Sequence, residues 1–333
     1  MLTASATALS WIPSESVPGV GRLAFESGVG LHYDDPPPGD LTKNYLDDNR
    51  LYRLSNHIAA WVDVRDGLIT GAGYQDVSSS RLGLTKVRMG HSETELVNVA
   101  LPDLQQAPKY GDGWVEFAQT AGGRTVIPFP RPVRRRPYFQ FAAPIIWTTV
   151  SLTIYADGRS DSRLSGASDF PRHWLYNNSG RLAAKAGLAD FKVWEKSSFG
   201  ANNPWHGQDH EALVTTAETA LERTLSEQIM SGKSKPHIAR LRPGESITRQ
   251  GEPGDRLYLI LNGVFIVEVD GKKIGEAGPG ALMGERALLE GGQRTATVKA
   301  LTSASVAITS AEDLDRADLI ELARGHHLED PAD

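Results

Sequence analysis

The stretch GALMGERALLEGGQRTATVKA, residues 280–300, places charged side chains among small and apolar residues. Its glycines permit close approach of the backbone to a ligand, and a short helix beginning near Gly284 would point free N–H groups at an anion. Arg294 offers a fixed fork of donors to a pair of phosphate oxygens, and Glu285 can accept a hydrogen bond from a ribose hydroxyl. The stretch therefore predicts a site that binds one phosphate and one sugar.

This pattern resembles the phosphate-binding cassette of the cyclic nucleotide-binding domain family, and the resemblance covers about residues 209–327. It continues into PGESITRQGEPGDRLYLILNG, residues 243–263. Five residues there stand where the family expects its turn and strand: Gly251, Gly254, Asp255, Tyr258 and Gly263. The resemblance implies that Glu285 takes the ribose 2′-hydroxyl and Arg294 the cyclic phosphate. It also implies that the backbone at Gly284, Arg286 and Ala287 completes the cradle.

Three further positions bear on the ligand. Thr295 follows the arginine at a position where family members carry Ser, Thr or Ala. A threonine there often accompanies contact with guanine in eukaryotic members, but the rule is unreliable in bacterial ones. Both cAMP and cGMP therefore remain open as the ligand. Met283 stands where Phe is common, a core change of similar volume. Arg286 stands where Leu is frequent, and we interpret it as a solvated charge at the rim, with tuning of affinity as the alternative.

The composition is that of a soluble globular protein. The 333 residues are 40% hydrophobic and 23% charged with a net charge of −6, which gives no electrostatic reason to expect nucleic acid as a partner. The chain has no cysteine, which fits a reducing cytoplasm. No window approaches the roughly 18 uninterrupted apolar residues of a membrane span. We therefore expect a cytoplasmic protein without a membrane segment or a cofactor.

Turn signals divide the first two thirds of the chain. Residues 1–50 carry a triple proline at 36–38 and many glycines, which predicts an irregular arm. In residues 51–208 short apolar runs alternate with Asp-Gly, Gly-Gly and Asn-Asn-Ser-Gly signals, the last at 177–180, a pattern typical of β-hairpins. We expect an antiparallel sandwich or barrel of unknown function there.

The pattern changes at Asp209, which can cap a helix over 209–231 with an apolar stripe at every third or fourth residue. After Pro236, short strands joined by Gly-Asp, Asn-Gly and Asp-Gly predict a compact, jelly-roll-like β-roll, and a terminal helix over 314–322 can close on it as a lid. The expected fold class is therefore mainly β with a few helices, and its last domain, over 209–333, is the roll with its leading and lid helices.

Other motifs have weaker support. We expect no helix-turn-helix after the roll, and Gly232-Lys233-Ser234 follows a predicted helix where a P-loop would follow a strand. His206 and His210 could ligate a metal if both lay on one helical turn. Gly207 argues that His206 is outside the helix, so a capping or linker role is the better interpretation of these residues. Two clusters could bind ligands, although a solvated loop and a sandwich core are the simpler interpretations: the basic run Arg131, Arg134, Arg135 and Arg136, and the aromatic run over residues 170–176.

The sequence thus favours a cyclic-nucleotide sensor that signals through the helix over 209–231 to an N-terminal effector domain or one that binds a protein partner. Two alternatives stay open. One is an N-terminal enzyme gated by the nucleotide, for which His57, Asp169 and His173 are the candidate residues. The other is an assembly scaffold with a degenerate roll. The oligomeric state is not predicted.

Overall fold

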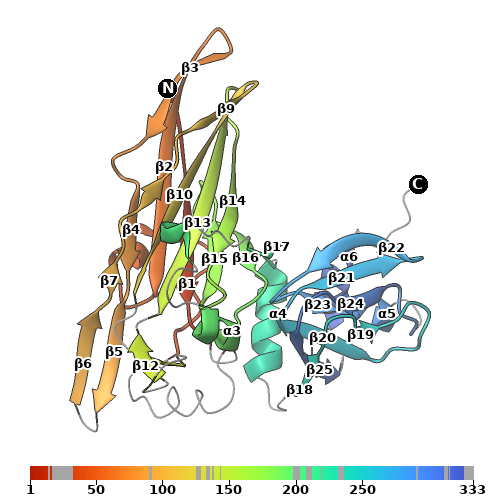
Figure 1. Cartoon of the computed structure of the whole chain (residues 1–333). Coiled ribbons are helices and arrows are strands. Elements are labelled where there is room, and N and C mark those ends of the chain that lie inside the picture. Colours follow the sequence, from red (N-terminus) through yellow and green to blue (C-terminus); the bar gives the residue numbers. More distant parts are fainter. Residues whose placement is uncertain are drawn as a thin grey trace. The chain divides into compact units, whose positions relative to one another are not determined.

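The computed structural model describes most of the chain. The described residues are 1–13, 16, 33–89, 92–124, 129–132, 136, 139–142, 144–197, 203–207, 212–218, 220–231, 236–289, 292–310, 314 and 316–325. The chain divides into two compact units, Met1–Ala212 and Leu213–Asp333. Strands dominate both units (Figure 1). Among the described helices, none combines the length and the apolar character that a membrane crossing requires.

The first unit is built from antiparallel strands in two main sheets (Figure 1). Its strands are β1 Leu2–Trp11, β2 Leu54–Arg65, β3 Leu68–Tyr74, β4 Ser79–Leu82, β5 Leu84–Met89, β6 Ser92–Val97, β7 Val99–Ala100, β8 Leu104–Gln105, β9 Lys109–Gly111, β10 Trp114–Arg124, β11 Phe129–Pro132, β12 Phe139–Ala142, β13 Ile145–Tyr155, β14 Ser160–Ala167, β15 Arg172–Tyr176 and β16 Leu182–Ala186. Its helices are α2 Lys43–Asp47, α3 Phe191–Ser197 and the short η1 Pro204–His206.

One sheet runs β16-β15-β1-β2-β3 with β4 on β2, and the other runs β14-β13-β10-β7 with β8 and β9 on β10. A buried amide pair joins them: Asn56 Nδ2 donates to Gln119 O at 3.1 Å and to Thr148 O at 3.0 Å, and Gln119 Nε2 donates to Asn56 Oδ1 at 2.9 Å. Buried polar groups that satisfy one another in this way fix the pairing of the sheets. The predicted antiparallel sandwich is confirmed.

Three predicted hairpin turns are confirmed. Asp66 and Gly67, with φ of 48° and 77°, join β2 to β3. Gly158 (φ 90°) joins β13 to β14, and Gly180 (φ 76°) joins β15 to β16. Each turn needs a left-handed backbone, which glycine adopts without steric cost and aspartate tolerates.

The turn predicted at Gly122 and Gly123 is wrong, because β10 continues through both residues to Arg124. A Cβ on Gly122 would overlap Ile146 O of the paired strand, and one on Gly123 would overlap a methyl group of Leu82. These glycines therefore serve close packing inside a strand instead of a reversal of the chain.

The irregular arm predicted over residues 1–50 is wrong in its first part. β1 lies between β2 and β15, with Ala8 opposite both Asn56 and Leu175. Its alternate small residues Ala4, Ala6 and Ala8 are buried. The prolines and glycines that suggested irregularity all follow this strand, so their signal does not extend to it.

His173 of β15 is a core residue of the first unit, with 0% exposure. Its Nδ1 lies 2.7 Å from Ser10 Oγ and its Nε2 lies 2.8 Å from Ser168 O. Because a carbonyl only accepts, Nε2 carries the proton and Nδ1 accepts from the Ser10 hydroxyl, which describes a neutral ring. Burial lowers the pKa of His173 to about 4, against a smaller opposing effect of the hydrogen bond to Ser168.

This depressed pKa predicts a pH dependence of stability. The unfolded chain binds a proton on His173 near the ordinary pKa of about 6.5 and the folded chain does not, so stability is complete above pH 6.5 and falls as the pH drops towards 4. We expect His173 to lower the free energy of unfolding, measured with urea, by up to about 1.4 kcal/mol for each pH unit in this range. His173→Gln should flatten that slope, and equal slopes in both proteins would contradict the assignment.

The second unit is a β-roll of two antiparallel sheets, β18-β25-β20-β23 and β19-β24-β21-β22 (Figure 1). Its strands are β17 Val214–Thr216, β18 His237–Leu241, β19 Ser246–Thr248, β20 Arg256–Asn262, β21 Phe265–Val269, β22 Lys272–Ala277, β23 Leu282–Met283, β24 Thr297–Ala300 and β25 Ala304–Ser310. Its described helices are α4 Ala220–Ser231, α5 Glu285–Leu289 and α6 Arg316–Gly325. The predicted β-roll is confirmed.

Strand β20 separates two cores because successive side chains point to opposite faces. Leu257, Leu259 and Leu261 pack with the helices, in a cluster that includes Leu225 of α4 and Leu319 of α6. Ile260 and Tyr258 face the other way, into the roll interior. This arrangement explains why the strand reads as an almost continuous apolar run.

The helix predicted over 209–231 is wrong in its first part. Residues Val214–Thr216 form strand β17, and the helix begins at Ala220. The β-branched run Val-Thr-Thr favours an extended backbone, which outweighs the apolar spacing that suggested a helix. Asp209, the predicted cap, lies outside the described residues.

Candidate functional site

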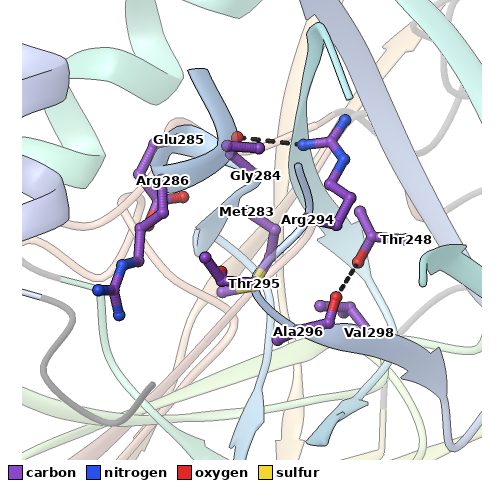
Figure 2. Close-up of a pocket in the computed structure, with 10 residues that line it drawn as sticks. Thr248, Met283, Gly284, Glu285, Arg286, Arg294, Thr295, Ala296 and Val298 are labelled. Carbon is purple, nitrogen blue, oxygen red and sulfur yellow. Dashed lines mark hydrogen bonds between the residues drawn. The ribbon is translucent and has the colours of Figure 1, made fainter. Parts of the chain in front are cut away.

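One cavity in the second unit is lined by all six predicted site residues (Figure 2). They are Gly284, Glu285, Arg286, Ala287, Arg294 and Thr295, and the lining also includes Thr248, Met283, Ala296 and Val298. Two separate segments, residues 283–287 around the start of α5 and residues 294–296 before β24, supply most of these groups. The structure therefore brings together what the sequence places about ten residues apart.

Gly284 forms the turn between β23 and α5, with a φ of 97°. A Cβ at this position would overlap Arg294 Nη1 and lie 2.9 Å from Arg256 O. Only glycine combines this left-handed backbone with so close an approach of an arginine. Gly284 thus allows α5 to begin next to the guanidinium of Arg294.

Arg294 is 6% exposed and is held by backbone carbonyls (Figure 2). Its Nη1 donates to Gly284 O at 3.1 Å and its Nη2 donates to Arg256 O at 2.9 Å. The guanidinium carbon also lies 5.4 Å from the centre of the Tyr258 ring. Two of the five N–H donors of the side chain pair in this way within the described part of the chain, and an anion could accept from the other three.

Glu285 is the first residue of α5 and is 2% exposed. Ala287, in the same turn, is 1% exposed. The first N–H groups of a helix have no partner within the helix, so the backbone here offers donors next to the Glu285 carboxylate, an acceptor. Donors for a phosphate and an acceptor for a hydroxyl therefore lie in one cavity.

Arg286 differs from the solvated rim charge that we expected. The residue is half-buried, its Nη1 atom is buried, and its side chain points away from Arg294 (Figure 2). Arg286 therefore lines the cavity without directing its guanidinium at Arg294.

The cavity volume is about 10 Å³, the room of about one water molecule. A nucleotide needs far more space, because pockets for small molecules commonly measure about 300–1,000 Å³. As described, the cavity holds only a small part of the volume that a nucleotide needs.

Two contributors to this site were not assigned to it from the sequence. Gly254 lies against Arg294, and a Cβ there would overlap the guanidinium. Thr248 lines the cavity and donates from Oγ1 to Ala296 O at 3.0 Å. The sequence marks Gly254 only as a turn residue. Nothing in the local sequence distinguishes Thr248, since strand pairing between β19 and β24 brings it to the cavity.

The three candidate enzyme residues are not brought together. His173 lies inside the sandwich, whereas His57 pairs with Thr7 at 2.8 Å on the opposite face of the same sheet. Asp169 is exposed. The structure does not assemble an acid, a base and a nucleophile from these positions.

The remaining candidates resolve as follows. His206 Nδ1 lies 3.0 Å from Asn203 Oδ1 and His210 lies outside the described residues, among which no metal-ligand cluster occurs. Arg134, Arg135 and residues 232–234 also lie outside them, and Arg136 is exposed. The aromatic run over 170–176 is core, with every residue of β15 buried, as the simpler interpretation predicted.

Residues 238–317 match the sequence model of the family described as Cyclic nucleotide-binding domain. The C-terminal third of the chain carries this domain. The chain is 38% identical over 82 residues to the cGMP-dependent protein kinase egl-4 of Caenorhabditis briggsae. The aligned segment covers 25% of this chain and 11% of that protein. It is 44% identical over 64 residues to the cAMP-dependent protein kinase type II regulatory subunit of Drosophila melanogaster, 19% of this chain and 17% of that protein.

A solved structure described as Sp-2Cl-cAMPS bound to PKAR CBD2 is 26% identical to the matched part of this chain. The match covers 32% of this chain and 84% of that chain, with a TM-score of 0.25. The matched segments cover less than a fifth of either curated relative.

Proposed function

We propose that this protein is a sensor of cAMP or cGMP, and that nucleotide binding in the second unit signals to the first unit as effector or as a site for a protein partner. The observation that carries the proposal is the convergence of Glu285 and Arg294, both almost fully buried, on one cavity. The absence of cysteine supports the cytoplasm as the proposed location.

The roles of the residues follow from their chemistry. Arg294 binds the cyclic phosphate with the donors that Gly284 O and Arg256 O leave available, in charge-assisted hydrogen bonds. Glu285 accepts from the ribose 2′-hydroxyl, and the backbone at Gly284, Arg286 and Ala287 surrounds the phosphate. Thr295 also lines the cavity, and its role in this proposal is contact with the base. One relative is named for cGMP and the other for cAMP, which supports keeping both ligands.

A thermal-shift titration of the intact chain tests this proposal. A ligand that binds only the folded state stabilises it by RT ln(1 + [L]/Kd), which is about 2.7 kcal/mol at 100 Kd. We expect cAMP or cGMP to raise the melting temperature in a saturable manner, while the linear 5′-monophosphates, which lack the cyclic ester, give little change. The absence of a shift with either cyclic nucleotide up to millimolar concentration, in the unaltered chain and in the Gly278→Ala variant described below, would contradict the sensor.

A further inference from the structure

Residues 215–222, which precede the roll, contact the segment 278–282, which precedes the cavity-lining residues Met283 and Gly284. Thr215 of β17 is 5% exposed, and a Cβ added at Gly278 would overlap its hydroxyl oxygen. That hydroxyl is buried and makes no hydrogen bond within the described part of the chain. The contact is thus so close that only glycine fits opposite Thr215.

Two glutamates continue this contact along the same segment. Gly280 has a φ of 100°, and a Cβ there would lie 2.5 Å from Glu218 Oε2. The Glu218 side chain is 4% exposed and pairs with Arg223, whose Nε lies 3.4 Å from Oε1. Glu222, also 4% exposed, accepts from the backbone N–H of Leu282 at 3.4 Å. Thr215 of β17, Glu218 of the connection between β17 and α4, and Glu222 of α4 therefore meet Gly278, Gly280 and Leu282 in turn.

The segment 278–282 is short and is itself held firmly. Gly280 N donates to Ile260 O at 2.8 Å, and Ile260 N donates to Ala281 O at 3.0 Å. Leu282 is fully buried in the cluster that contains Leu225 of α4. Met283 and Gly284, which line the cavity, follow at once. A displacement of this segment is therefore passed to the cavity within two residues.

We propose that Thr215, Glu218 and Glu222 form a latch that holds residues 278–282, and through them the cavity, in its narrow form. This inference rests on the proposed function. The latch residues precede the matched domain at 238–317 and occupy the stretch through which the chain arrives from the first unit. A nucleotide that widens the cavity moves the segment away from the latch, so binding and latch release share one coupling free energy.

The latch has a directional consequence. If the binding-competent form is populated only when the latch is open, the apparent affinity is reduced by the fraction of closed molecules. Weakening the latch from outside the cavity should then tighten nucleotide binding, which a general loss of packing would not do.

Titration calorimetry on the full chain, with cAMP and cGMP as probes, tests the latch through Gly278→Ala. The added methyl group pushes Thr215 away, and we expect Kd to fall about fivefold or more, the lower end of common allosteric couplings. Thr215→Gly removes the three atoms that the new methyl group would meet, so the double variant Thr215→Gly, Gly278→Ala should return Kd towards the unaltered value. Gly271→Ala, in a hairpin turn with open space around it, is the control and should leave Kd unchanged.

A second pair of variants covers the case in which Gly278→Ala does not fold. Glu222→Ala removes the acceptor of the Leu282 N–H and should also tighten binding, whereas Glu222→Gln keeps an acceptor oxygen and should resemble the unaltered chain. Hydrogen exchange supplies an independent measure: saturating nucleotide should speed exchange over residues 214–222 in the unaltered chain.

The outcomes separate the latch from the sensor. Tighter binding in Gly278→Ala, or binding seen only in that variant, supports the latch. Binding in the unaltered chain with an equal or larger Kd in Gly278→Ala and Glu222→Ala overturns the latch alone. Failure of the unaltered chain and of both variants to bind either nucleotide overturns the latch together with the proposed function.

Discussion

Arg294→Ala is expected to bind cyclic nucleotide about 100-fold more weakly than the unaltered chain. Hydrogen bonds to charged groups contribute about 1.5–3 kcal/mol, and about 2.7 kcal/mol corresponds to 100-fold in Kd. The side chain is already fixed by Gly284 O and Arg256 O, so the unaltered protein loses little side-chain entropy when phosphate binds. Titration calorimetry with each nucleotide measures the change.

The matched control for this prediction is Arg294→Lys. Lysine keeps the charge but lacks the planar fork that reaches two carbonyls and a phosphate together, so an intermediate affinity is expected. Because Arg294→Ala also leaves two carbonyls without their donor, the melting temperature of each variant must show that the roll remains folded. A folded Arg294→Ala with a Kd within threefold of the unaltered value would remove Arg294 from the site.

Gly284→Ala is the second change for which we expect a large effect. The left-handed backbone costs a residue with a Cβ roughly 1–2 kcal/mol, and the added methyl group must in addition displace Arg294 Nη1 and approach Arg256 O. We expect a loss of more than about 2 kcal/mol of stability in urea unfolding and a Kd at least about tenfold larger.

Gly271→Ala separates the two causes, because Gly271 has a φ of 74° but nothing within contact of a new Cβ. It should show the cost of the backbone alone and leave nucleotide binding unchanged. Equal losses of stability and of affinity in the two variants would show that Gly284 does not serve to admit Arg294.

The grouping of the predicted site residues around one cavity could be expected from the sequence because most of them are close along the chain. Glu285 and Arg294 lie within ten residues of each other, and glycines mark the turn between β23 and α5. What surrounds the cavity could not be predicted, since Arg256 and Tyr258 reach Arg294, and Thr248 reaches the cavity, from strands tens of residues away in the sequence. Local patterns do not encode such distant contacts, and the latch at Gly278 and Gly280 was invisible for the same reason.

The fold could be predicted where turns need an unusual backbone. Asp66, Gly67, Gly158 and Gly180 reverse the chain as expected. The pattern failed where glycine serves packing instead, as at Gly122 and Gly123 within β10. Proline-rich and glycine-rich surroundings likewise concealed β1, whose small alternating residues carry a weak strand signal.

The central claim, that Glu285 and Arg294 hold one cyclic nucleotide, is tested most directly by titration calorimetry of the intact chain with cAMP and with cGMP, paired with the same titrations of Arg294→Ala. The account predicts saturable binding of at least one of them at one nucleotide per chain, with that binding lost or about 100-fold weaker in the folded variant. Binding that is equal in both proteins, or absent for both nucleotides in the unaltered chain and in Gly278→Ala, would contradict it.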